Sequence, residues 1–365
     1  MVCSNMIPLF RVNYNGLENL GSRFIDVVKR AVMTSTHIDS LRVVLVDNGS
    51  RDGSFDIVRE RFYDTVMPLK LRSNLGHSMG VNVALKMYFN AVGCTPRYAF
   101  VMDKDYAITN PEGLRGLVEY AMRDPRAVAL QGINLKSNGR VSDAGILVTT
   151  FLKPVFRCDG LAVGECPERL SYVSSVISCL ALYNVKVILS KRKLMFNRYN
   201  IIYHDDVDLS LEMWSYGYTS KFIPTVVGVH YWSSARKRMD KAFVSYESRR
   251  GRVLLNRRFS RYVKAVSLLA PYIKSIALAL PRLGSPDPVR VRTRALIDAL
   301  RLKVEQFKGP YEPLLVKPTI KVYPYHYGTS RLATRILKLL ETLVVDRSTL
   351  LNSRRPFIVS LSSSS

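Results

Sequence analysis

Residues 41–54 read LRVVLVDNGSRDGS, and this stretch decides the fold class. Its first six residues, 41–46, are mostly β-branched and apolar, which predicts a short buried strand. The polar run 47–54 contains Asn-Gly and Asp-Gly, which favour turns, together with Ser and Asp, which are common helix N-caps. The apolar residues from Phe55 to Phe62 recur at helical spacing. The stretch therefore predicts a strand, a loop and a helix.

The same alternation continues along the chain. Strands are predicted at 66–71 and 98–102, and helices at 78–91 and 111–122. Strands that alternate with helices of this length are typical of an α/β fold, a Rossmann-like, mostly parallel sheet with helices on both faces. In such sheets ligands bind at the carboxyl ends of the strands, so the residues that follow each strand are the candidates for function.

The composition is that of a globular protein. The 365 residues are 47% hydrophobic and 10% aromatic, which excludes long-range disorder, and the length suits one large domain with an appendage or two domains. The first twenty residues carry no secretory signal, and the apolar segments 171–185 and 265–281 do not fit a membrane span, so we expect a cytoplasmic protein.

The five cysteines form no CxxC pair and are interpreted as buried or inert thiols of a reducing compartment. These cysteines are Cys3, Cys94, Cys158, Cys166 and Cys179.

The positive charge is concentrated near the C-terminus. The formal net charge is +25, and residues 230–365 hold 27 Lys and Arg against 8 Asp and Glu. Basic helices are predicted at 241–262 and 287–307, and residues 290–301 have the spacing of a basic amphipathic helix. Either nucleic acid or an anionic membrane surface could attract such a region. We favour the membrane, because the arginines alternate with Leu, Ile and Val and not with stacking aromatics.

Acidic residues gather at three places in the chain. Asp103-Lys104-Asp105 follows the strand 98–102, and this pattern fits either a solvated turn or a divalent cation held by oxygen ligands. Asp205, Asp206 and Asp208 begin an apolar-periodic helix that ends at Gly217, and capping explains only some of them. The extended stretch 219–232 brings His230 to its end, where a lone histidine is more often structural than functional.

Five motifs follow one another along the chain, namely VDNGSRDGS (46–54), NLGHSMGVN (74–82), DKD (103–105), HDDVDLSLEMWSYGY (204–218) and HYW (230–232). Their order resembles the family-2 glycosyltransferases with the GT-A fold, particularly the rhamnosyltransferase-like branch. The opening VNYNG (12–16) is similar to that family's first strand and loop, and the resemblance covers about residues 6–235. It implies a catalytic GT-A domain over 1–235, followed by a basic, mainly helical region over 236–365.

The resemblance implies a site for a nucleotide-diphosphate sugar. Asp47 would accept a hydrogen bond from the nucleotide base, and Asp103 would approach the ribose and the metal. Asn74 and Gly76 resemble the loop that closes over the nucleoside. The donor-binding residues that the resemblance implies are Val12, Asn13, Asp47, Asn74, Gly76, Asp103 and Asp105.

The resemblance also implies a metal and a general base. Asp105 and His230 would bind Mn²⁺ or Mg²⁺ at the diphosphate. Asp206 would take the proton of the acceptor hydroxyl in an inverting reaction. Asp205 stands where the family usually has Glu, so either Asp205 or Asp206 could face the acceptor, and we prefer Asp206. Glu212 stands where relatives often have Arg.

The function implied is transfer of a hexosyl or deoxyhexosyl group. The acceptor would be a glycan, a glycolipid, a glycoprotein or a lipid-linked sugar, reached from a peripheral position on the cytoplasmic face of a membrane. Two alternatives are a non-catalytic GT-A-like nucleotide-binding protein and a basic nucleic-acid-binding protein. A nucleic-acid-binding protein would not explain the ordered acidic motifs, so we do not expect nucleic acid as a partner.

Overall fold

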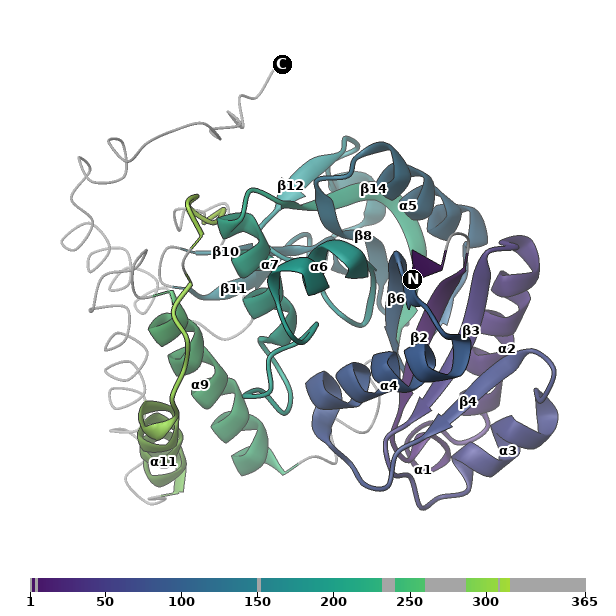
Figure 1. Cartoon of the computed structure of the whole chain (residues 1–365), viewed down its shortest axis with the longest axis horizontal. Coiled ribbons are helices and arrows are strands. Elements are labelled where there is room, and N and C mark those ends of the chain that lie inside the picture. The colour runs from purple at the N-terminus through teal and green to yellow at the C-terminus, as the bar shows by residue number, and fades with distance from the viewer. Residues whose placement is uncertain are drawn as a thin grey trace. The chain divides into compact units, whose positions relative to one another are not determined.

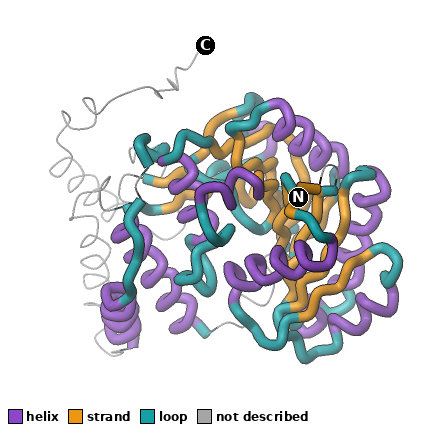
Figure 2. Tube along the Cα trace, in the orientation of Figure 1, coloured by secondary structure: helices purple, strands orange, loops and turns teal. Residues whose placement is uncertain are grey.

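The protein is built around one ten-stranded sheet (Figures 1 and 2). The computed structural model describes residues 2–3, 6–149, 152–231, 240–259, 287–307 and 309–315. In spatial order the main strands are β12 (Ser171–Val173), β14 (Thr219–His230), β8 (Ala127–Leu135), β13 (Leu180–Asn184), β6 (Tyr98–Asp103), β2 (Ile7–Asn13), β3 (Leu41–Asp47) and β4 (Val66–Lys70). Strand β7 (Tyr106–Ile108) pairs with β14, and β9 (Val141–Asp143) pairs with β8.

Two smaller sheets and the helices complete the described residues. The small sheets pair β1 (Val2–Cys3) with β5 (Thr95–Pro96), and β10 (Ile146–Val148) with β11 (Pro154–Phe156). The helices are α1 (Gly16–Leu20), α2 (Arg23–His37), α3 (Ser54–Arg61), α4 (Gly76–Val92), α5 (Pro111–Arg123), the 3-10 turn η1 (Val163–Glu165), α6 (Val185–Lys191), α7 (Asp205–Ser215), α9 (Lys241–Arg258) and α11 (Asp287–Arg301).

Most predicted elements are confirmed. The strands expected at 41–46, 66–71 and 98–102 are β3, β4 and β6, and the helices expected after each of them are α3, α4 and α5. The C-terminal helices α9 and α11 are also present, although α9 ends at Arg258 and α11 at Arg301. The apolar segment 265–281 lies outside the described residues. Among the residues that are described, no helix is long and apolar enough to cross a membrane.

Both faces of the sheet are buried, as the sequence predicts. Side chains alternate along a strand, so Leu45 of β3 packs in the hydrophobic cluster that contains Phe24 of α2. Its neighbour Val46 packs in a second cluster, which contains Val81 of α4. This two-sided burial explains why 41–46 is an unbroken apolar run except at Arg42.

The strand directions bring several polar residues to one edge of the sheet. Strands β6, β2, β3 and β4 are parallel, so their carboxyl ends lie at the same edge. Strand β13 is antiparallel to β6, with Leu180 opposite Met102, so its amino end lies at that edge too. The Asp103 N–H donates to the carbonyl of Cys179 at 3.0 Å. The sheet is therefore mixed, and the loop before β13 meets the end of β6.

A buried charge cluster joins α7 to α9. Arg258 Nε donates to Asp208 Oδ1 at 2.6 Å, and its Nη2 donates to Glu212 Oε2 at 2.9 Å. Arg192 lies 3.1 Å from Asp208 and 3.2 Å from Glu212. Burial raises the pKa of Glu212 to about 7, although the arginine charges act against it. Helix α11 lies beside α9 (Figure 1). The Tyr246 hydroxyl of α9 donates to Asp298 Oδ2 of α11 at 2.7 Å.

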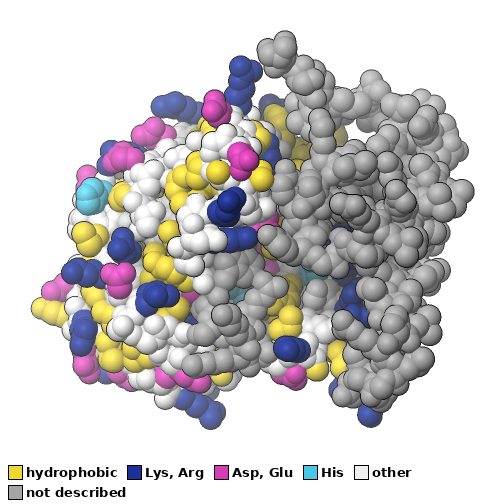
Figure 3. All heavy atoms as spheres, turned by 180° about the vertical axis from the view of Figure 1, so that it is seen from behind, with side chains coloured by type: hydrophobic (Ala, Val, Ile, Leu, Met, Phe, Trp, Pro, Cys, Tyr) yellow, Lys and Arg dark blue, Asp and Glu magenta, His cyan; other side chains and the backbone are white. Residues whose placement is uncertain are grey.

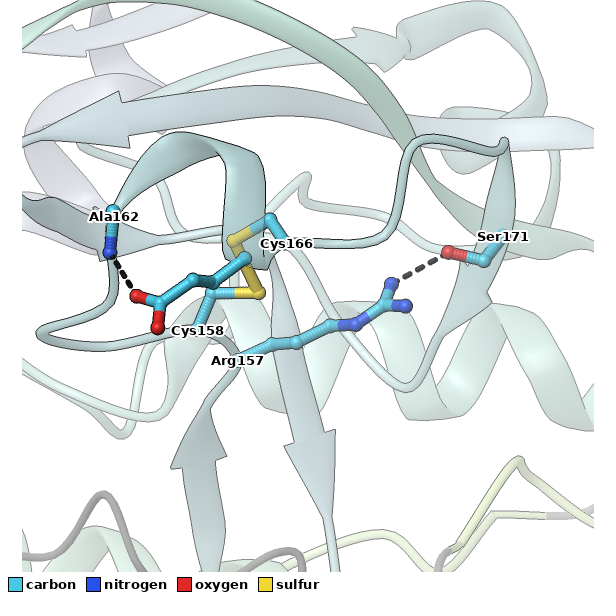
Figure 4. The surroundings of a disulfide bond; sticks show 6 residues. Arg157, Cys158, Ala162, Cys166 and Ser171 are labelled. Carbon is cyan, nitrogen blue, oxygen red and sulfur yellow. Dashed lines mark hydrogen bonds between the residues drawn. A yellow bond between two sulfur atoms is a disulfide. The ribbon is translucent and has the colours of Figure 1, made fainter.

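The interpretation of all five cysteines as isolated thiols is wrong. Cys158 and Cys166 are joined by a disulfide, with their Cα atoms 5.9 Å apart (Figure 4). The two residues are only eight apart in sequence, on either side of η1, and their spacing is not one of the short motifs that indicate pairing. Cys179 is a free, buried cysteine, as expected.

We expect Arg258→Met to destabilise the protein by about 3–5 kcal/mol, because removal of one partner leaves Asp208 and Glu212 buried with too little positive charge. Urea unfolding at pH 7 measures the loss. Arg30→Met is the control, since Arg30 forms an exposed ion pair with Asp26 that contributes less than about 1 kcal/mol. Equal losses of stability in the two variants would contradict the larger contribution expected of the buried cluster.

Candidate active site

Two aspartates and a histidine meet where the chain leaves β6 and enters β7, which pairs with β14. Asp103 ends β6, Asp105 precedes β7, and His230 at the end of β14 pairs with Tyr106 of β7. His230 Nε2 lies 3.3 Å from Asp105 Oδ1, and the Tyr231 N–H donates to the Asp105 carbonyl at 2.9 Å. One ligand atom from each of Asp103, Asp105 and His230 lies within 4.8 Å of the others. The two predicted metal ligands are therefore neighbours, and Asp103 joins them.

The chemistry of these three side chains fits a divalent cation. Asp105 and His230 are buried, and Asp103 is partly exposed. Burial raises the pKa of Asp103, the charge of His77 acts against this, and the charge of Asp105 adds to it. A cation between the two carboxylates would offset both the burial and the repulsion. Carboxylate and imidazole groups are common ligands of divalent metals.

A buried arginine supports the turn between the two aspartates. Arg11 of β2 is fully buried, donates from Nη1 to the Tyr106 carbonyl at 3.1 Å, and donates from Nη2 to the Lys104 carbonyl. Burial lowers the pKa of Arg11 to about 10, and the charges of Asp105 and Asp103 act against this fall. Sequence reasoning missed this residue. The available signal was a single charged residue inside the apolar run 7–12.

Asp205 is held by two side chains of the motif 74–82. His77 Nδ1 donates to Asp205 Oδ2 at 2.7 Å, and Ser78 Oγ donates to the same oxygen at 3.0 Å. Burial acts to lower the pKa of His77, but the charge and hydrogen bond of Asp205 outweigh it and raise that pKa to about 9. Burial alone would raise the pKa of Asp205, whereas His77 and Ser78 lower it. His77 belongs to the motif 74–82, but the sequence predicted no role for it.

Asp206 lies beside Asp205 in a different environment. It is partly exposed, and it accepts hydrogen bonds from the Ser178 N–H at 3.3 Å and the Val207 N–H at 2.7 Å. Burial raises the pKa of Asp206 to about 7, and the charge of Asp205 adds to the rise. A carboxylate with a pKa near 7 is suited to accept and release protons at neutral pH. The two adjacent aspartates are thus distinguished by their contacts.

The His77 side chain connects the start of α7 to the aspartate and histidine cluster. Its Nδ1 binds Asp205, and its Nε2 lies 3.7 Å from Asp103 Oδ1. The sequence separates Asp103 from Asp205 by about a hundred residues, and the fold brings both to one imidazole ring. The predicted base candidates and metal ligands therefore belong to one site.

A polar pocket of about 470 Å³ lies on the first loops of the sheet. Lys104 Nζ donates to the Tyr14 carbonyl at 2.6 Å, so the Asp103–Asp105 turn adjoins this pocket. Asn74, one of the predicted donor-binding residues, lines it, whereas Gly76 does not. The lining residues are Tyr14, Asn15, Gly49, Arg51, Arg72, Ser73 and Asn74.

Asp47 and Asn13 lie beneath this pocket. Both side chains are fully buried, and Asp47 accepts hydrogen bonds from Asn13 Nδ2 at 2.9 Å and from the Ser50 N–H at 3.0 Å. Gly49 has φ +79°, and a Cβ there would lie 2.6 Å from the Ser73 carbonyl carbon. Val12 pairs in register with Asp103. Asp47 thus fixes the loop 47–54, and its predicted contact with a nucleotide base stays a prediction.

The chain shares sequence features with one known family. Residues 12–159 match the model of glycosyl transferase family 2. The family resemblance is confirmed. The rhamnosyltransferase-like branch stays a prediction, and none of the curated proteins matches the sequence.

The fold is similar to that of solved structures. A crystal structure of GalNAc-T7 with UDP, GalNAc and Mn²⁺ has a TM-score of 0.56 and 12% identity, over 84% of this chain and 56% of that chain. The chain thus spans just over half the length of that relative. The mannosyltransferase PcManGT from Pyrobaculum calidifontis, in complex with GDP-Man and Mn²⁺, has a TM-score of 0.47 and 17% identity, over 94% of this chain and 81% of that chain. The predicted GT-A fold is confirmed by the first of these.

We expect Asp206→Asn to raise the melting temperature, and to raise it more at pH 8 than at pH 5. In the folded protein the pKa of Asp206 is raised to about 7, so its contribution to stability is full below the ordinary pKa near 4 and is lost as the pH rises through 7. Asparagine keeps the neutral form at every pH and avoids that loss. The gain at pH 8 should reach at least about 3 °C in thermal melts with chelator present.

Asp26→Asn is the matched control, since Asp26 is an exposed carboxylate on α2. It should give no gain that grows with pH. An Asp206→Asn gain that is the same at pH 5 and pH 8 would contradict the raised pKa.

Proposed function

We propose that this chain is an inverting glycosyltransferase that moves a hexosyl or deoxyhexosyl group from a nucleotide-diphosphate sugar to an acceptor hydroxyl. The observation that carries the proposal is the bridge formed by His77. It links Asp205 to Asp103, which is one of three side chains that fit a divalent cation. The base candidate Asp206, which is partly exposed, follows Asp205 directly in the sequence. The match of residues 12–159 to glycosyl transferase family 2 supports the same chemistry.

In the proposed reaction Asp206 acts as the general base. As the acceptor oxygen attacks the anomeric carbon, Asp206 takes the proton of the hydroxyl, and the bond from that carbon to the diphosphate oxygen breaks. The electron pair of that bond leaves with the nucleoside diphosphate. A single displacement of this kind inverts the anomeric carbon and requires only one base. The pKa of Asp206 near 7 supports this role.

Asp103, Asp105 and His230 would hold the metal. A bound divalent cation would supply Lewis acidity that neutralises the charge of the departing diphosphate. Oxygen ligands suit both Mg²⁺ and Mn²⁺, whereas imidazole suits transition metals, so His230 favours Mn²⁺. The presence of Mn²⁺ and UDP in the GalNAc-T7 structure supports this assignment.

The polar pocket is the proposed place of the nucleoside. It adjoins the Asp103–Asp105 turn through the contact between Lys104 and Tyr14, and it contains Arg51 and Arg72. Those cations would attract the anionic donor. A glycan or lipid-linked acceptor stays a prediction from the family resemblance, and an anionic membrane surface stays a prediction from the spacing of residues 290–301. Figure 3 shows the molecule from behind, and on the coloured part of this face Lys and Arg side chains are interspersed with Asp and Glu.

We expect Mn²⁺ together with one nucleoside diphosphate to raise the melting temperature of the protein. A ligand at one hundred times its Kd adds about 2.7 kcal/mol of stability. The measurement is a thermal-shift panel of nucleoside diphosphates and nucleotide sugars, with Mn²⁺, with Mg²⁺ and with chelator. The chelator should abolish most of the shift, and Asp105→Asn should do the same.

The exposed carboxylate Asp39 provides the control variant, Asp39→Asn, which should keep the full shift. A shift of equal size in chelator would remove the metal from the proposal. No shift with any nucleotide would limit the family relationship to the fold.

We expect Asp206→Asn to lower the transfer rate by about 10²–10⁴-fold, the usual contribution of a general base. Binding of the nucleotide sugar should change little, because Asp206 is not among the residues that line the pocket. Release of nucleoside diphosphate with an acceptor panel measures the rate, and the thermal shift measures binding. Unchanged turnover would exclude Asp206 as the base, and Asp205→Asn would then be the variant that loses activity.

A further inference from the structure

The imidazole of His77 lies between two acidic groups of the proposed site. Nδ1 binds Asp205 Oδ2 at 2.7 Å on one side of the ring, and Nε2 lies 3.7 Å from Asp103 Oδ1 on the other. The side chain is only 15% exposed. Within the described residues Nε2 is buried and makes no hydrogen bond. One ring nitrogen therefore binds Asp205, and the other faces the proposed metal ligand Asp103.

The backbone fixes this ring in place. The His77 N–H donates to the Ile201 carbonyl at 2.8 Å, and Ile201 precedes α7 by four residues. Gly76 has φ +78°, and a Cβ there would lie 2.6 Å from the Ile201 oxygen. Only glycine allows this close approach without movement of the backbone. The amino end of α4 is thus tied to the segment that leads into α7.

The ring also packs against the side chain of Phe196, a residue whose backbone is held by hydrogen bonds. The centroids of His77 and Phe196 are 5.8 Å apart. Asn82, one helical turn and a half along α4, holds Phe196 by two hydrogen bonds to its backbone, 2.8 Å and 3.0 Å long. Contacts on both sides and at the backbone leave the imidazole little freedom to turn, as a positioning role requires.

We propose that His77 is a positioning residue, which fixes Asp205 and the amino end of α7 relative to Asp103 and thereby sets Asp206 as the carboxylate that faces the acceptor. The inference rests on the proposed function and assigns the base within it. Asp205 Oδ2 is occupied by His77 and Ser78, and Asp205 is buried. Asp206 is the partly exposed member of the pair.

Three substitutions separate the two nitrogens of the ring. His77→Asn keeps a donor at the position of Nδ1, since the amide nitrogen of asparagine is the same number of bonds from Cα. His77→Gln places its donor farther out, nearer to the position of Nε2. His77→Ala removes both. His37→Asn is the control for loss of a histidine, because His37 is exposed at the end of α2.

The kinetic test measures whether a substitution of His77 changes kcat or KM. His77→Ala should lower kcat by about 10²-fold, because small errors in the position of a catalytic group have effects of that size, with the donor KM within about threefold of the wild type. His77→Asn should restore kcat to within about tenfold of the wild type, and His77→Gln should not. An asparagine variant as slow as the alanine variant would overturn the inference, as would a loss confined to KM.

The second test uses the metal-free protein and needs no turnover. A double-mutant cycle of thermal stability compares His77→Ala, Asp205→Asn and the pair. If the two residues act through their contact, the double variant should melt close to the less stable single variant. Additive losses would overturn the inference, whether or not the protein transfers sugar.

The two tests separate failure of the inference from failure of the proposed function. If the wild type binds no nucleotide and shows no transfer, the proposed function fails. A strongly non-additive cycle would then still support His77 as the residue that organises the acidic cluster. If the wild type is active and His77→Ala keeps its kcat, the inference fails and the proposed function stands.

Discussion

Negative charge concentrated at one edge of a largely buried sheet is the constraint on which the site depends. Carboxylates that leave an apolar strand lose water, and each must gain a positive neighbour or a hydrogen-bond donor. Arg11 supplies one cation from beneath the turn after β6, and His77 supplies another between Asp103 and Asp205. A divalent cation would complete the compensation at Asp103 and Asp105. The buried cations are therefore as much a part of the site as the aspartates they support.

The position of Asp206 follows from long-range contacts of the sheet. Its partner is the backbone of Ser178 in the loop before β13, and that loop is held from β8, where Gln131 Oε1 accepts a hydrogen bond from the Ile177 N–H at 2.6 Å. Gln131 in turn donates to the buried Asp143 of β9. Because β13 runs antiparallel to β6, this loop reaches the edge where Asp103 lies. A fully parallel sheet would place it at the opposite end.

Local patterns in the sequence were sufficient for β3, β4, β6 and the helices that follow them, and for two members of the candidate metal cluster, whereas His230 was predicted only from the family resemblance. The run 41–46 and its turn residues predicted β3 and α3, and the strand ends pointed to Asp103 and Asp105. The roles of Arg11 and His77 could not be predicted, because each acts on residues far away in sequence that only the pairing of strands and the docking of α7 bring close. The disulfide between Cys158 and Cys166 was missed for a different reason, since the two residues are close in sequence but their spacing around a 3-10 turn matches no motif that indicates pairing.

Glu212 shows how a departure from a family pattern is accommodated. The family that the sequence resembles often has arginine at this position, and glutamate there places two acids, the buried Asp208 and the largely buried Glu212, on one face of α7. The structure provides Arg192 from the loop after α6 and Arg258 from α9, and each contacts both acids. Because Arg258 lies beyond residue 235, the helix that begins with Asp205 and Asp206 takes part of its charge compensation from the C-terminal region. That region therefore contributes to the stability of α7.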